Sequence, residues 1–146
     1  MTNSNPIRKQ GSLRRSILAV FAGAVTAIVL IMAVQQASAL VYPSPAGLDP
    51  DDREAMAAYT ATMPAGAFLF VLASYAVGTF GGAWLAAWIA RRVRLVHGMI
   101  IALLLLLASI ANLLMLPGHP AWFAIANLAL IPVAAWLGVK CIPSRN

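Results

Sequence analysis

The chain has 146 residues, of which 62% are hydrophobic and 10% are charged, and its formal net charge is +6. A soluble domain has about 25% charged residues, so this composition excludes an ordinary soluble fold and indicates a protein that is dissolved in a bilayer. The basic surplus does not indicate nucleic-acid binding, because the Lys and Arg residues flank apolar segments and form no patch interleaved with aromatic side chains. The single cysteine, Cys141, excludes an intramolecular disulfide.

The charged residues are sorted along the chain in a way that predicts a membrane topology. All 4 acidic residues lie between positions 49 and 54, whereas every basic residue except Arg53 lies in one of three other places. Those basic residues are Arg8, Lys9, Arg14, Arg15, Arg91, Arg92, Arg94, Lys140 and Arg145. Cytoplasmic loops carry an excess of Lys and Arg. The pattern predicts a multi-pass protein of the bacterial inner membrane with both termini in the cytoplasm.

Apolar segments alternate with these charged places and predict the fold class. A helix needs about 20 apolar residues to cross roughly 30 Å of hydrocarbon. Segments of suitable length, without Asp, Glu, Lys or Arg, occur at about residues 16–41, 65–90, 95–116 and 121–139. Backbone groups in lipid must be paired within the segment, which favours helices. We predict an all-α membrane protein, with residues 1–146 forming one domain that is a four-transmembrane-helix bundle.

The N-terminal segment also resembles a secretory signal peptide, because bases precede an apolar run and Ala37, Ser38 and Ala39 form a small-residue motif. However, the apolar run extends from Ile17 to Val34, beyond the roughly 7 to 15 residues of a signal sequence. We therefore expect an uncleaved first helix. The polar residues 1–12 are expected to form a flexible tail.

Small residues recur at four-residue spacing in the first and second predicted crossings. They are Ala19, Gly23 and Ala27 in the first crossing, and Ser74, Gly78, Gly82 and Ala86 in the second. Such strips allow helix backbones to approach closely, so we predict that both are helix-packing surfaces. The sequence leaves open whether they meet within one chain or between two copies.

The segment 42–64 is the longest predicted loop, and its sequence indicates a short helix at the membrane surface. Asp49 is expected to cap this helix and Pro50 to occupy its first position. Met56, Tyr59 and Met63 are spaced to share one face. The acidic cluster also allows binding of a divalent cation as a weaker alternative, but capping explains the adjacent carboxylates and we predict no metal site.

The third and fourth crossings are expected to form an antiparallel hairpin, because residues 117–120 contain two prolines and a glycine. Asn112 and Asn127 lie at similar distances from this turn. We predict that these two intramembrane amides hydrogen-bond across the hairpin. A polar step on a permeation path is the alternative for both residues.

Three segments resemble an uncharacterised family of small bacterial four-helix integral membrane proteins. They are YPSPAGLD at residues 42–49, GTFGG at 78–82, and NLLMLP at 112–117 followed by HPAWF at 119–123. The resemblance implies the fold but no activity, so no catalytic residue is carried over. Gln35 and Gln36 depart from the more strongly ionisable residues of that region in the family, so no site is carried over there.

No constellation of residues in the sequence identifies a reaction, and we predict no catalytic residue, cofactor or enzymatic activity. The expected function is that of a small inner-membrane component that self-associates or accompanies a larger membrane-protein complex, with the lipid bilayer as its solvent. The alternative is an oligomeric transporter or channel for small solutes or lipophilic compounds. Without a membrane carboxylate, transport would depend on the neutral groups of Gln35, Tyr75, Asn112 and Asn127.

Overall fold

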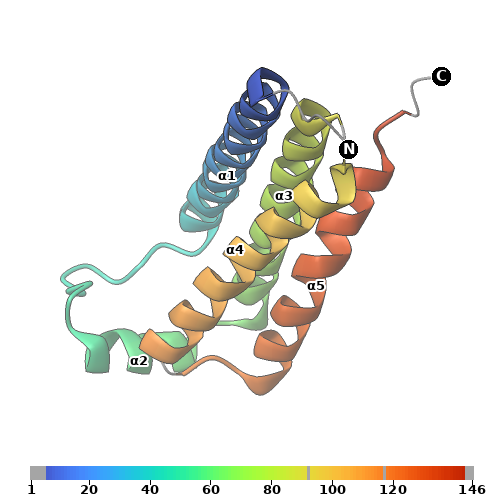
Figure 1. The fold of residues 1–146 in the computed structure, drawn as a ribbon. Helices are drawn as coiled ribbons and strands as arrows, with labels where there is room; N and C mark the ends of the chain where they lie inside the picture. The colour runs from blue at the N-terminus through green and yellow to red at the C-terminus, as the bar shows by residue number, and fades with distance from the viewer. Residues whose placement is uncertain (1–5, 92, 117, 144–146) are drawn as a thin grey trace.

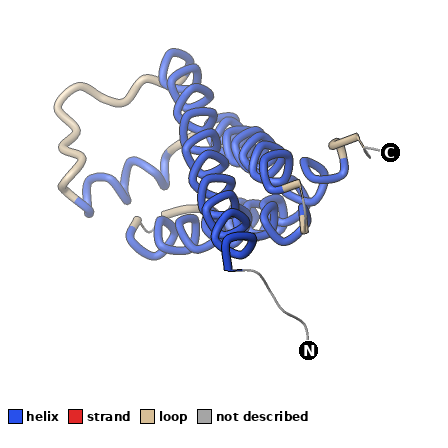
Figure 2. Tube along the Cα trace, turned by 45° about the horizontal axis from the view of Figure 1, so that its top comes forward, coloured by secondary structure: helices blue, strands red, loops and turns tan. Residues whose placement is uncertain are grey.

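The computed structural model describes residues 6–91, 93–116 and 118–143, and side chains from Ser12 onward. These residues form helices joined by loops, without a strand among them (Figure 2). The helices are α1 (Pro6–Val41), α2 (Arg53–Thr62), α3 (Ala65–Ala90), α4 (Arg94–Met115) and α5 (Ala121–Lys140). Within the described residues, four of them, α1, α3, α4 and α5, are long and apolar enough to cross a membrane. For the described residues, the prediction of an all-α protein with four helices suited to crossing a membrane is confirmed.

The first helix is longer than the sequence indicated. The polar segment that was expected to be a flexible tail is helical from Pro6 onward, so that prediction is wrong for residues 6–12, while residues 1–5 lie outside the described part. Proline suits the first turn of a helix because its missing N–H would have no intrahelical partner there. No further proline follows before Pro43, and the helix continues to Val41.

Helix α3 is the centre of the bundle (Figure 1) and packs against α1, α4 and α5. Its contact with α1 is made by small residues. A methyl group added to Gly23 would lie 2.7 Å from the Gly82 carbonyl oxygen, and one added to Gly82 would lie 2.6 Å from the Gly23 carbonyl oxygen. The next small residue along each helix continues the contact, because a methyl group on Gly78 would lie 2.8 Å from the Ala27 carbonyl oxygen. The two small-residue strips therefore meet each other within a single chain.

The remaining strip residues are also enclosed by the bundle. Ala19, Ser74 and Ala86 are completely buried. Next to them lies an apolar core whose largest members are Ile101 of α4 and Ile131 of α5. This core fills the part of the bundle nearer the α3–α4 connection.

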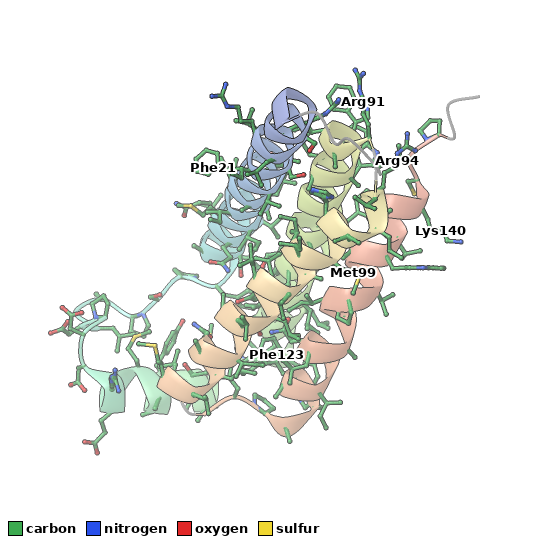
Figure 3. The ribbon with its side chains drawn as sticks, viewed as in Figure 1. Phe21, Arg91, Arg94, Met99, Phe123 and Lys140 are labelled. Carbon is green, nitrogen blue, oxygen red and sulfur yellow. The ribbon has the colours of Figure 1, made fainter. Side chains whose placement is uncertain are left out.

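Apart from Arg53 of α2, the basic side chains that the structure describes gather at one end of the bundle, which we call the basic end. Figure 3 shows Arg91, Arg94 and Lys140 together at this end. Two basic side chains fasten the helix ends there: Arg15 Nε donates to the Ile89 carbonyl at 2.6 Å, and Arg94 Nη1 donates to the Pro143 carbonyl at 3.1 Å. The last carbonyls of a helix lack intrahelical donors, so the bond from Arg15 satisfies one of them at the end of α3.

The opposite end carries the loop 42–52 and α2, and we call it the acidic end. Asp52, rather than the predicted Asp49, is the N-cap of α2, and its carboxylate accepts from the backbone N–H groups of Glu54 and Ala55, each at 3.0 Å. Asp49 instead accepts from the Asp51 N–H at 2.9 Å and closes a turn before the helix. A cap must lie two or three residues before the N–H groups that it binds, and only Asp52 does so for a helix that begins at Arg53.

Helix α2 meets the bundle at the turn between α4 and α5. Gly118 in this turn has φ +109°, and a methyl group added to it would lie 2.6 Å from the Ala57 carbonyl oxygen. Only glycine combines this backbone conformation with so close an approach. The turn thereby holds α2 across the acidic end of the bundle (Figure 1).

Candidate functional site

A cavity of about 350 Å³ lies at the acidic end of the bundle. It is lined by residues from α1, the loop 42–52, α2, α3, α4, the α4–α5 turn and α5. Its polar lining residues are Gln35, Ser38, Tyr42, Ser44, Tyr59, Thr60, Tyr75, Asn112, His119 and Asn127. Asp, Glu, Lys and Arg do not occur among the described residues that line it. The cavity therefore combines neutral polar groups with apolar surface, and it carries no formal charge when His119 is neutral.

The four neutral groups that were named for the transport hypothesis come together in this cavity. Gln35 comes from α1, Tyr75 from α3, Asn112 from α4 and Asn127 from α5. Tyr75 is the deepest lining residue of α3, ten positions after Ala65, the first residue of that helix. The lining residues of α3 run from Ala67 to Tyr75, so at a rise of 1.5 Å per residue the cavity extends about 12 Å along this helix.

The deepest polar contact joins α5 to α4. Asn127 is 2% exposed, and its Nδ2 donates to Ser109 Oγ at 2.6 Å, while its Oδ1 has no hydrogen-bond partner. Ser109 also interacts with the Tyr75 hydroxyl of α3. These three side chains tie α3, α4 and α5 together at the base of the cavity. They leave one buried acceptor unused.

The predicted hydrogen bond between Asn112 and Asn127 does not form, and Ser109 takes the place of Asn112. The reason is depth. Ser109 lies six residues before Met115, the last residue of α4, and Asn127 lies six residues after Ala121, the first residue of α5. Asn112 lies one helical turn nearer the end, is exposed and lines the cavity. The prediction compared the distances of Asn112 and Asn127 from the prolines of the turn. Distances from the ends of α4 and α5 instead pair Asn127 with Ser109.

An aromatic cluster forms the wall of the cavity on the side of α5. Phe68 and Phe123 are 3% and 2% exposed, with ring centroids 5.1 Å apart. The His119 ring stacks on Phe123 at 5.3 Å, and His119 Nδ1 lies 2.9 Å from the Leu116 carbonyl oxygen. A carbonyl only accepts, so Nδ1 carries the proton of this bond, and in the neutral ring Nε2 is an acceptor.

Helix α2 covers the cavity with one face. Met56, Tyr59 and Met63, which were predicted to share a face, all line the cavity together with the buried Thr60. Thr60 Oγ1 donates to the Met56 carbonyl at 2.8 Å, so its hydroxyl is paired within the helix. The acidic residues of this region, Asp51, Asp52 and Glu54, are exposed and do not line the cavity.

The cavity is closed on the side of the basic end. Tyr75 packs against the apolar core that contains Ile101 and Ile131, and this core separates the cavity from the basic residues. Along each long helix, the lining residues lie in the part nearer the acidic end. The cavity is therefore confined to the part of the bundle nearer the acidic end.

One residue at the base of the cavity, Ser109, was not predicted from the sequence, and Cys141 lies away from the cavity. Ser109 was missed, because a lone serine in an apolar helix usually bonds its own backbone; its spacing of three residues from Asn112 was the available signal. Cys141 is free and exposed at the basic end. Among the described residues no group of three His, Cys, Asp or Glu side chains is placed to hold a metal ion.

Comparisons of the chain with models of protein families, with curated proteins and with solved structures find no match.

Proposed function

We propose that the chain is a multi-pass protein of the bacterial inner membrane that binds a small amphipathic molecule in the cavity at its acidic end, without catalysing a reaction. The observation that carries this proposal is the uncharged cavity, lined by both polar and apolar side chains, with an unpaired, buried Asn127 Oδ1 at its base. Burying a polar group without a partner costs free energy. A bundle that served only to pack would be more stable with apolar side chains at this depth.

The topology that accompanies this proposal has the basic end in the cytoplasm. Arg91, Arg94 and Lys140 lie together at that end, as expected for cytoplasmic loops. The starts of α1 and α4 and the end of α5 also lie there (Figure 1). In this topology both termini are cytoplasmic and the cavity lies on the outer side of the membrane.

In the same topology, α2 is an interfacial helix. Its exposed Asp52 cap and Glu54 face water, while Met56, Tyr59 and Met63 face the cavity and the bundle. Tyrosine is enriched at the boundary between membrane and water, which supports this position.

The protein acts alone, as a homo-oligomer or as an accessory subunit of a larger membrane complex. Its small-residue strips are occupied by the contact between α1 and α3. Association would therefore use a lipid-exposed face. Trp84 and Trp88 of α3 form such a face, because both are exposed and their rings stack with centroids 6.3 Å apart.

A transporter of small solutes or lipophilic compounds is the second candidate. The meeting of Gln35, Tyr75, Asn112 and Asn127 in one cavity favours it, because these are the neutral groups that transport would need. Passage to the cytoplasm would require the core around Ile101 and Ile131 to open. Flux of a bound compound through reconstituted vesicles would support transport, and retention of that compound without flux would support a binding component.

Occupancy of the cavity is tested with a pair of variants in α1. Ala39 is exposed and lines the cavity, so Ala39→Trp would fill it without disturbing the buried core. Ala37 is also exposed and does not line the cavity, so Ala37→Trp is the matched control. The full chain is purified gently from native membranes, and its bound small molecules are identified by native mass spectrometry.

We expect a small molecule to copurify with the wild type and with Ala37→Trp, but not with Ala39→Trp. Equal occupancy in all three proteins, or none in the wild type, would contradict the proposed function.

A further inference from the structure

We infer that the ligand of this cavity is a neutral, lipid-like amphiphile whose head carries a hydroxyl group, and that this hydroxyl donates a hydrogen bond to Asn127 Oδ1. The inference depends on the proposed function, because it names the class of molecule that the same site would bind.

The requirement for a donor comes from Asn127. An asparagine amide has two N–H donors and one carbonyl oxygen acceptor. In this site Nδ2 donates to Ser109 Oγ at 2.6 Å, whereas Oδ1 is buried and unpaired. Asn127 lines the cavity, and a small movement of its buried side chain toward the cavity would bring Oδ1 within reach of a molecule there. A ligand donor would satisfy the acceptor, and a ligand that carried only acceptors would leave it unpaired.

The requirement for neutrality comes from the lining. A buried charge needs an opposite charge or several hydrogen bonds to compensate for the loss of hydration. The described lining residues include no carboxylate, ammonium or guanidinium group. The acidic residues before and within α2 are exposed to the surroundings and are not part of the lining. A hydroxyl is therefore a better head than a carboxylate, a phosphate or an amine.

The apolar body of the ligand is indicated by the walls and the entrance. Phe68, Val71 and Leu116 supply apolar surface in the cavity. Gln35 of α1 and Asn112 of α4 are exposed lining residues, so the cavity reaches the surroundings between these two helices. Contact between α1 and α4 is much less extensive than contact between α1 and α3. In the proposed topology this entrance faces the outer leaflet, which is the source of the ligand.

A matched pair of probes isolates the hydrogen bond. Oleyl alcohol and oleyl methyl ether share the same chain and head oxygen, but only the alcohol has a donor. The full chain is incorporated into phosphatidylcholine nanodiscs with equal amounts of both probes. Native mass spectrometry of the released protein then gives the ratio of the two bound probes. One ordinary hydrogen bond corresponds to a preference of about two- to tenfold.

We expect the wild type to bind the alcohol about fivefold better than the ether, and Ala37→Trp to do the same. Ala39→Trp should lose both probes. Asn127→Leu, which removes the acceptor, should bind the two probes equally. Ser109→Ala keeps the acceptor and should retain the preference, which separates loss of recognition from loss of the bond between α4 and α5.

Equal binding of alcohol and ether by the wild type, with both lost in Ala39→Trp, would overturn the hydroxyl inference and leave the proposed function standing. If neither probe binds while a native molecule occupies the cavity, the hydroxyl inference is again overturned and the proposed function again stands. Binding of both probes that is unchanged in Ala39→Trp would instead overturn the proposed function.

Discussion

The contact between α1 and α3 makes a sharp prediction for the substitution Gly82→Ala. The added methyl group would lie 2.6 Å from the Gly23 carbonyl oxygen and 2.8 Å from Ala27 Cβ, whereas an ordinary contact begins at 3.4 Å. The two backbones would have to separate by about 0.8 Å. Overpacking of this kind costs about 1–3 kcal/mol. For a chain of this size that cost corresponds to a fall in unfolding temperature of roughly 3–10 °C.

The neighbouring glycine provides the control. A methyl group added to Gly81 would first meet the end of the Leu30 side chain, Cδ1, which can rotate away, and it meets no backbone atom. Gly81→Ala should therefore leave the unfolding temperature almost unchanged or raise it slightly, because alanine favours a helix.

Thermal unfolding followed by circular dichroism in detergent measures both variants, and native mass spectrometry measures their oligomeric state. If Gly82→Ala kept the wild-type unfolding temperature but changed the oligomeric state, the small-residue strips would join two chains, and the intrachain packing described above would be refuted.

Three further outcomes are expected. Ser109→Ala and Asn127→Leu should couple by about 0.6 to 2 kcal/mol in a double-mutant cycle of unfolding, because the two side chains share one membrane hydrogen bond; additive effects would show that the bond contributes nothing. Asp52→Ala should destabilise α2 by about 0.5–2 kcal/mol and speed amide hydrogen exchange at its first turn, since both capping bonds are lost. Asp49→Ala should affect that turn much less, and a reversed order of the two variants would contradict the cap assignment. Reporter fusions at both termini should be active in the cytoplasm and a reporter inserted in the loop 42–52 outside it; termini on opposite sides would exclude the proposed topology.

The pairing between α4 and α5 explains why the site was only partly predictable. The sequence drew attention to Asn112 and Asn127 because amides are rare in apolar helices, and both residues do line the cavity. It could not identify the partner of Asn127, since that depends on the relative depth and rotation of two helices. Each residue advances a helix by 1.5 Å and about 100°, so a small error in the helix ends exchanges one partner for another.

At the acidic end of the bundle, too, the sequence predicted only part of what the structure shows. A helix with Met56, Tyr59 and Met63 on one face was predicted from their spacing; α2 carries Met56 and Tyr59, whereas Met63 follows the end of the helix in an extended conformation, and all three line the cavity. Its orientation over the cavity depends on the close approach of Gly118 to Ala57, two residues that are far apart in the sequence. Spacing defines a face, but only the neighbouring elements decide what that face covers.

The amino-acid sequence by itself determined the apolar segments, their lengths and the placing of charge between them. These properties are local, because a bilayer requires each crossing to satisfy its own backbone and excludes charge from its interior. Only the tertiary structure decided that the strips around Gly23 and Gly82 meet within one chain, that Asn127 bonds Ser109, and that polar groups from every long helix share one cavity. These features depend on how the helices are rotated and offset against one another, which is fixed by the packing of all of them together.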